Sequence, residues 1–211
     1  MAMKLPRHGK VKGMTRRELL AITPGLLLVN CSSDTAQKTP EKPAEPVTGL
    51  HALYQMYTFA RTWAQDLKVI RLSSMPVSEV KAVSGKAAAW QVQFASESLG
   101  KARTYTFSVY DESVTLRQGI FPDAAGPLSG DIRSFAIGAA ATDSDKAWEI
   151  SREHSQKYSD EHPGMPISYI LEGDRQTGAP VWRVIWGTST ASSSFSILVD
   201  AHAGTYVRTL F

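Results

Sequence analysis

The sequence of 211 residues predicts an α+β protein with two tandem units, each a helix packed on a small antiparallel sheet. Apolar residues recur with helical spacing from about residue 49, alternating apolar and polar segments follow, and the same order returns about 90 residues later. With 43% apolar and 20% charged residues the chain can bury a core. Its single cysteine excludes an intramolecular disulfide and a cysteine-based metal site.

Residues 1–30 have the pattern of an export signal. A basic stretch containing Arg16 and Arg17 precedes an 11-residue, mostly apolar run from Leu19 to Val29. This run is shorter than the roughly 20 residues that cross a bilayer, so we expect no permanent membrane helix here. The arginine pair resembles the twin-arginine export signal of bacteria, and the general secretory route stays open as the alternative. Translation from Met14 instead of Met1 also stays open.

Cys31 lies where the apolar run ends. The preceding residues Leu28-Val29-Asn30 resemble the lipobox of bacterial lipoproteins, although Asn30 departs from the small residue usual there. The resemblance implies that Cys31 becomes the lipidated first residue of the mature protein. Residues 31–48 are rich in proline, serine and charge, a composition typical of an extended spacer that does not fold. We therefore expect a lipid-anchored protein facing the periplasm.

The basic character of the chain belongs to its leading segment. The first 30 residues contain six lysines and arginines against one acidic residue, Glu18. The other 181 residues contain 17 basic and 19 acidic groups, a net charge of −2. Net charge therefore gives no support to nucleic-acid binding by the mature protein.

The first unit is expected over residues 49–120. Its helical stripe comprises Leu50, Leu53, Tyr54, Tyr57, Ala60, Ala64 and Leu67. Two strands with one buried face are expected where Trp90, Val92 and Phe94, and then Tyr105, Phe107 and Val109, alternate with polar residues. A further strand over residues 69–72 would end before Pro76.

Residues 121–141, rich in glycine, alanine and proline, are interpreted as a connector with a short strand at 132–137. The second unit is expected over residues 142–211. Its helix begins at a capping segment, 142–145, carries Ala147, Ile150, Ser151, His154 and Tyr158 on one face, and stops at Pro163. Strands are expected at 166–171, 181–186, 195–199 and 205–210, with a hairpin loop from Asp200 to Gly204.

Three segments of the second unit resemble the PepSY domain. They are Ala147-Trp-Glu-Ile-Ser, Val181-Trp-Arg-Val-Ile, and Phe195-Ser-Ile-Leu-Val-Asp-Ala-His-Ala-Gly-Thr-Tyr-Val. The resemblance covers about 143–210 and extends to 49–118 only through the internal repeat, in which 111–114 form a shorter turn without glycine. It implies a helix on a small antiparallel sheet that binds or inhibits a protein in the cell envelope. Tandem copies are similar in architecture to the beta-lactamase inhibitory proteins, in which a concave sheet holds the partner.

The sequence gives little sign of catalytic chemistry. His154 and His162 lie eight residues apart, which does not match the spacing of zinc proteases, so no metal and no cofactor are expected. We expect a non-enzymatic lipoprotein that binds an envelope protein. Two alternatives stay open: an envelope hydrolase that uses these histidines with nearby carboxylates, and a structural envelope assembly factor.

The partner is expected on the sheet face that points away from the helices. Alternation along the strands assigns to this face Gln91, Gln93, Arg183, Tyr206 and Arg208. Exposed tyrosine and arginine beside a few aliphatic residues are typical of an interface, and an ordinary solvated sheet face without a partner stays open as the alternative.

Lipidation at Cys31 is directly testable. The variant Cys31→Ala lacks the thiol that would carry the lipid, so it should leave the membrane fraction and be found among the soluble exported proteins. Fractionation and immunoblotting measure this. Retention of the variant in membranes would refute lipidation at this residue.

Overall fold

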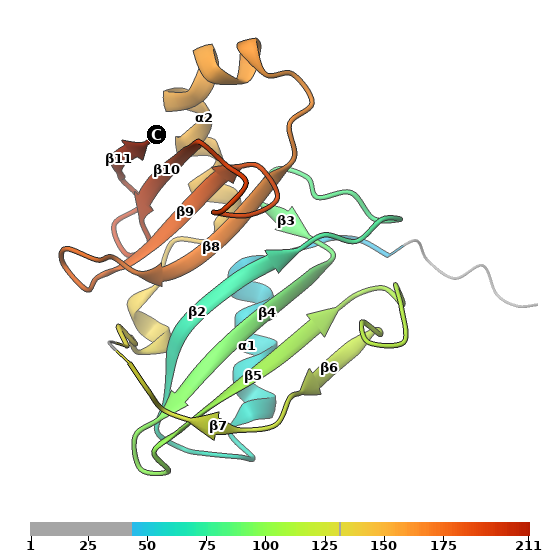
Figure 1. The fold of residues 1–211 in the computed structure, drawn as a ribbon, viewed down its shortest axis with the longest axis vertical. Helices are drawn as coiled ribbons and strands as arrows, with labels where there is room; N and C mark the ends of the chain where they lie inside the picture. The colour runs from blue at the N-terminus through green and yellow to red at the C-terminus, as the bar shows by residue number, and fades with distance from the viewer. Residues whose placement is uncertain (1–43, 131) are drawn as a thin grey trace, which may run out of the picture. The chain divides into compact units, whose positions relative to one another are not determined.

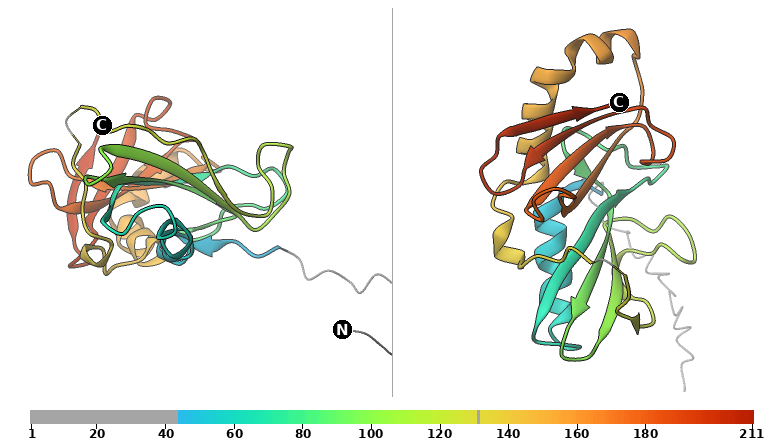
Figure 2. Two further views of the ribbon diagram at one scale, coloured as in Figure 1. Left: turned by 90° about the horizontal axis from the view of Figure 1, so that it is seen from below. Right: turned by 60° about the vertical axis from the view of Figure 1, so that its left-hand side comes forward.

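The computed structural model describes residues 44–130 and 132–211, and these form an α+β fold. Both helices lie on one face of a nine-stranded sheet (Figures 1 and 2). The elements in chain order are β1 (Val47–Thr48), α1 (Gly49–Ala60), β2 (Leu67–Met75), β3 (Lys86–Ala87), β4 (Ala89–Ser96), β5 (Lys101–Ser108), β6 (Gly119–Pro122), β7 (Gly126–Pro127), the 3₁₀ turn η1 (Ile137–Ala139), α2 (Ser144–Glu161), β8 (Ile167–Gly173), β9 (Pro180–Trp186), β10 (Phe195–Asp200) and β11 (Tyr206–Leu210).

The sheet has the strand order β11-β10-β9-β8-β2-β4-β5-β6, with β7 also paired to β5. All of its pairs are antiparallel, and β1 and β3 form a separate two-stranded ribbon. Strands β2 and β8, the first sheet strands after α1 and α2, pair in the middle of the sheet. One continuous sheet therefore joins the two parts of the chain that follow the helices.

Helix α1 is shorter than the apolar stripe predicted. Leu50 and Leu53 of the predicted stripe are buried against the sheet, whereas Tyr54 is exposed and Met56, which the stripe omitted, is buried. The helix ends at Ala60. The predicted stripe continued through Ala64 and Leu67, and this extension was wrong. Ala64 lies in the turn after the helix and Leu67 is the first residue of β2, so both are buried in the same core without being helical.

Helix α2 begins and ends where the sequence predicts. Asp143 is its N-cap, and the Asp143 carboxylate accepts a hydrogen bond from the Ser144 amide. Ala147 and Ser151 are buried, but His154, which was placed on the same apolar face, is exposed. The imidazole lies beside the edge strand β11 instead of over the middle of the sheet, because it stacks on Tyr206.

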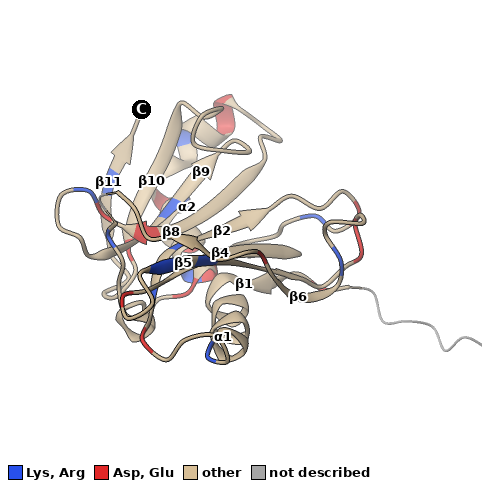
Figure 3. Ribbon diagram, turned by 60° about the horizontal axis from the view of Figure 1, so that its bottom comes forward, with Lys and Arg blue, Asp and Glu red and all other residues tan. Residues whose placement is uncertain are grey.

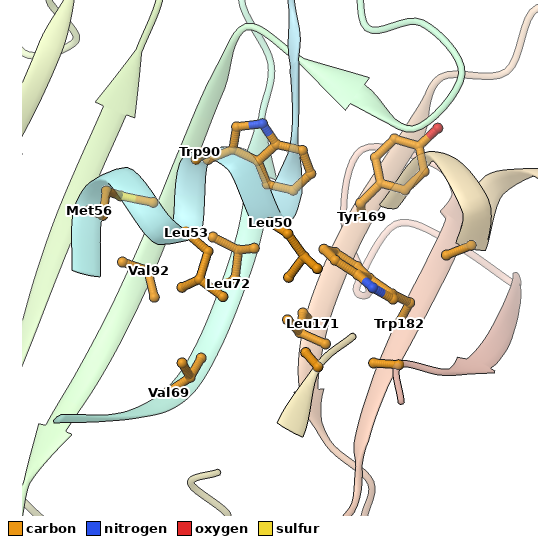
Figure 4. Close-up of a cluster of buried hydrophobic side chains, with 14 of the residues drawn as sticks. Leu50, Leu53, Met56, Val69, Leu72, Trp90, Val92, Tyr169, Leu171 and Trp182 are labelled. Atoms are coloured by element: carbon orange, nitrogen blue, oxygen red, sulfur yellow. The ribbon is translucent and has the colours of Figure 1, made fainter. Parts of the chain in front are cut away.

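Three tryptophans form the centre of the core. Trp90 on β4 and Trp182 on β9 are both fully buried, and their rings meet edge to face with centroids 6.3 Å apart (Figure 4). Trp186 is buried further along β9. Their alternation with residues of the other face predicted this placement correctly. A Cβ on Gly49 would lie 2.4 Å from Cη2 of Trp182, so α1 can begin this close to the indoles only with glycine.

The segment 121–141 is less of a connector than the sequence suggests. Its start completes β6, a fourth strand that pairs with β5. The expected strand at 132–137 is reduced to a single bridge between Phe135 and Val69. The loop from β5 to β6 runs from Val109 to Gln118, so the prediction of a short turn at 111–114 was wrong. Two apolar anchors in this region, Leu116 and Phe135, are buried and hold the chain to the sheet.

The two helix N-termini meet and share one capping pair. The Gly49 amide donates to the Ser144 hydroxyl at 2.7 Å, and the Leu50 amide donates to the Asp143 carboxylate at 2.8 Å. Thr48, the N-cap residue of α1, makes no side-chain cap of its own. The Ser144 hydroxyl in turn donates to the Gly85 carbonyl. Amides at the start of α1 are thus satisfied by side chains from the start of α2.

The predicted export signal at 1–30, with Arg16 and Arg17, and the predicted lipidation site Cys31 lie outside the described residues. The expected spacer over residues 31–48 is described only from residue 44, and its predicted end was wrong because Val47–Thr48 form β1 and pair with β3. Among the residues that the structure does describe, no helix combines the length and the apolar character of a membrane span.

The shared cap predicts an unequal response to two neighbouring substitutions. Asp143→Ala removes an acceptor used by both helices and should lower the free energy of unfolding by about 1–3 kcal/mol. Asp145→Ala, in the first turn of the same helix, removes a carboxylate that accepts only from the adjacent Lys146 amide and should cost less. Urea denaturation measures both. Equal losses would show that Asp143 acts through the helix dipole alone.

Candidate functional site

Four of the five predicted partner-binding residues share the sheet face opposite the helices. Gln91 and Gln93 alternate with the buried aromatic residues of β4, and Arg183 does the same on β9. Arg208 on β11 is joined to this group through Leu198 of β10, which is in register with both arginines. The polar surface of this face therefore crosses both parts of the sheet.

Tyr206 lies on the other face. Its ring stacks on His154 of α2 with the centroids 3.9 Å apart, so it belongs to the helix side. The register between β10 and β11 shifts after Leu198, and this bulge turns Tyr206 and Arg208 to opposite faces despite their spacing of two residues. The assignment of Tyr206 to the partner-binding face was wrong for this reason.

Arginine side chains line a depression on the face opposite the helices. Two adjoining hollows of about 330 and 270 Å³ share Glu172, Gly173 and Arg175 in their walls. Together they form what we call the arginine groove, whose charged lining residues are Arg71, Arg133, Arg175, Arg183, Arg208, Glu172 and Asp174. Figure 3 shows basic and acidic segments together on β8, β11 and the loop between β8 and β9. The groove lies between Gln93 on β4 and the edge strand β11.

Asp174 is the buried acid of the groove. Its carboxylate accepts hydrogen bonds from the Gln176 and Thr177 amides and from the guanidinium of Arg208. Burial alone would raise the pKa of Asp174, but these hydrogen bonds and the charge of Arg208 lower it overall. The carboxylate thus orders the β8–β9 hairpin and holds Arg208 against the sheet.

Arg183 occupies the middle of the groove. Its Nε donates to the hydroxyl of Ser196 at 3.0 Å, and no other group of the described chain accepts from this guanidinium. Burial lowers the pKa of Arg183, and the positive charges of Arg71 and Arg175 lower it further, although Glu172 opposes this. Arginine stays protonated at neutral pH despite such shifts, so the groove carries gathered like charges.

Sequence reasoning missed Arg71, Arg175 and both carboxylates of the groove. The signal at Arg71 is ambiguous, because Arg71 lies next to the buried Leu72 but two residues after the buried Val69, and a β-bulge between Val69 and Arg71 places the arginine on the face opposite the helices. Its neighbour Glu172 lies directly across from it on β8, with 3.8 Å between Arg71 Nε and a carboxylate oxygen. Arg175 and Asp174 lie in the hairpin loop between β8 and β9, where apolar and polar residues do not alternate as they do in a strand. The sequence therefore does not indicate which face of the sheet their side chains join.

The histidines of the enzymatic alternative do not meet. His154 stacks on Tyr206, and His162 stacks on Tyr158 with centroids 4.1 Å apart while its Nδ1 lies 3.0 Å from the Tyr158 carbonyl oxygen. The described residues contain no group of three His, Cys, Asp or Glu side chains arranged to hold a metal ion. Each of these two imidazoles stacks on a tyrosine ring instead of facing the other histidine.

A second cavity, of about 480 Å³, lies between the segment after β2 and the start of β8. Trp148, Met165 and Tyr169 contribute apolar surface, and Lys81 is the one charged residue among the described residues that line it. The Tyr169 hydroxyl accepts a hydrogen bond from the Gly85 amide at 2.9 Å, and burial raises the pKa of this phenol to about 12. The cavity is thus apolar and distinct from the arginine groove.

Comparisons with protein families, curated proteins and solved structures gave no match. The likeness to the PepSY domain accordingly rests on the segments quoted above from the second unit.

The buried carboxylate of the groove predicts a pH-dependent loss of stability. Because the folded-state pKa of Asp174 is lowered, its stabilisation is complete above the ordinary pKa of about 3.9 and is lost as pH falls through the folded-state value. Asp174→Asn should therefore lower the free energy of unfolding by about 1–3 kcal/mol at neutral pH. The difference from wild type should shrink below about pH 4.

Urea denaturation at both pH values measures this effect. The exposed Asp160→Asn on α2 is the matched control and should change little. A difference that stays constant with pH would show that the carboxylate charge is not responsible.

Proposed function

We propose that this chain is a non-catalytic lipoprotein of the bacterial envelope that binds or inhibits another envelope protein. The binding surface is the sheet face opposite the helices. The observation that carries the proposal is the arginine groove, which lies across this face in a chain whose residues 31–211 have a net charge of −2. A cluster of basic groups on a protein of negative net charge favours recognition of a partner at that cluster.

Matching contacts in the two halves support an internal duplication. The indole Nε1 of Trp90 donates to the Val47 carbonyl at 3.1 Å, and that of Trp182 donates to the Thr142 carbonyl at 2.7 Å. Val47 and Thr142 each directly precede the N-cap residue of the helix in their own half. In each half, the indole of the tryptophan thus donates a hydrogen bond to the equivalent position before the helix of that half.

Strand pairing supports the same interpretation. Within each half, a tryptophan-bearing strand lies between the strand that follows the helix and a third antiparallel strand, giving β2-β4-β5 and β8-β9-β10. The halves meet through their equivalent strands β2 and β8, as a local two-fold relation requires. Two PepSY-like units, 49–120 and 142–211, joined side by side are the architecture we propose.

The proposed cellular location depends on the leading segment. Cys31 would carry the lipid and the proline-rich residues after it would separate the fold from the membrane surface. Such a tether leaves the groove accessible to a partner that is itself held in the envelope.

Site-specific photo-crosslinking in cells tests the proposal. A benzoylphenylalanine at the exposed Gln93, on the groove side, should give a discrete crosslinked species with one envelope protein. The same residue at the exposed Glu153, on the outer surface of α2, is the control and should not. Absence of any crosslink from Gln93, or equal crosslinks from both positions, would contradict binding through this face.

A further inference from the structure

The groove has an excess of positive charge that the described residues do not neutralise. Leaving Arg133 aside, the groove has four arginines, Arg71, Arg175, Arg183 and Arg208, against two carboxylates, and both carboxylates are already engaged. Asp174 is bound by Arg208 and the hairpin amides, and Glu172 lies beside Arg71. Arg175 and Arg183 form no ion pair within the described part of the chain. Their guanidinium groups remain available to an external anion.

The geometry favours a carboxylate ligand. A guanidinium presents its N–H groups as a planar fork that binds a carboxylate through two parallel hydrogen bonds. Only Nε of Arg183 is occupied, by Ser196, so its terminal nitrogens can form such a pair. Partial burial strengthens this interaction, because the groove replaces part of the surrounding water with protein. A bound anion would also relieve the repulsion among Arg71, Arg175 and Arg183.

The extent of the groove favours an extended ligand over a compact ion. Gln93 on β4 and Arg208 on β11 are separated by five strand spacings of about 4.8 Å each, or roughly 24 Å. A single small anion contacts only part of this distance. An extended peptide of about seven residues covers it at roughly 3.4 Å per residue. Gln93 and Gln176 at the two ends offer amide groups for a peptide backbone.

We propose that the arginine groove binds an extended acidic segment of the partner protein, with Arg175 and Arg183 as its principal carboxylate contacts. This inference rests on the proposed function and specifies the chemistry of the partner. The segment lies across the strands, and its carboxylates alternate with backbone groups that reach the glutamines.

Fluorescence anisotropy with a labelled heptaglutamate peptide and the purified full chain in detergent tests the inference. Wild type should bind the peptide at low salt and more weakly at high salt. The double variant Arg175→Gln/Arg183→Gln should lose at least about tenfold in affinity. The control Arg61→Gln/Arg152→Gln changes net charge equally on the helix side and should keep the wild-type affinity. A labelled heptalysine should not bind.

Two further measurements keep the inference falsifiable. Arg175→Gln alone changes an exposed hairpin residue, so its loss of affinity cannot be attributed to unfolding. Inorganic phosphate is added as a competitor, and displacement of the peptide at phosphate concentrations near that of the protein would overturn the inference in favour of a compact-anion site. Equal losses in the two double variants would overturn it as non-specific charge attraction.

The crosslinking assay separates this inference from the proposed function. If the Gln93 crosslink persists in the Arg175→Gln/Arg183→Gln background, the partner binds the face without an acidic segment, and only the present inference fails. If wild type gives no crosslink although heptaglutamate binds, the proposed function fails and the assignment of the groove to a partner protein fails with it. Loss of the crosslink in the groove variant but not in the control variant supports both.

Discussion

The rest of the structure depends on the hydrogen bonds that join the starts of the two helices. The first amides of a helix have no partner inside it, and leaving them buried without acceptors is costly. Here Asp143 and Ser144, at the start of α2, supply acceptors for Leu50 and Gly49 at the start of α1. Directly beneath, Trp90 and Trp182 pack against Gly49. This joint sets the position of one helix against the other.

The strands that come after the two helices pair with each other beneath them. Strands β2 and β8 pair in the middle, and the sheet continues from one half into the other without an edge. The arginine groove is a product of this continuity, because Arg71 comes from the first half while Arg175 and Arg183 come from the second. The second half alone contributes Arg175, Arg183 and Arg208, and the pairing of β2 with β8 adds Arg71 from the first half. The pairing of β2 with β8 thus places Arg71 beside Glu172 on the face opposite the helices.

The strands were the most predictable part of the fold, and the groove was the least. Alternation around Trp90 and Trp182 correctly identified β4 and β9, because each face of these strands has one consistent environment. The end of α1 was misplaced because Ala64 and Leu67 are buried for reasons of tertiary packing, which helical spacing cannot distinguish. Tyr206 was misplaced because a bulge changes the facing of residues without changing their spacing. The groove depends on residues brought together by pairing between distant strands, so no local pattern marks it.

The N-terminus of α1 is capped by side chains of α2, which couples the folding of the two halves. Thr48 makes no side-chain cap for its own helix, so α1 relies on side chains about 95 residues further along the chain. A fragment containing only the first half would lose these acceptors together with the β2–β8 pairing. The two halves are therefore expected to melt in a single cooperative transition, as one folding unit despite their separate helices and strands.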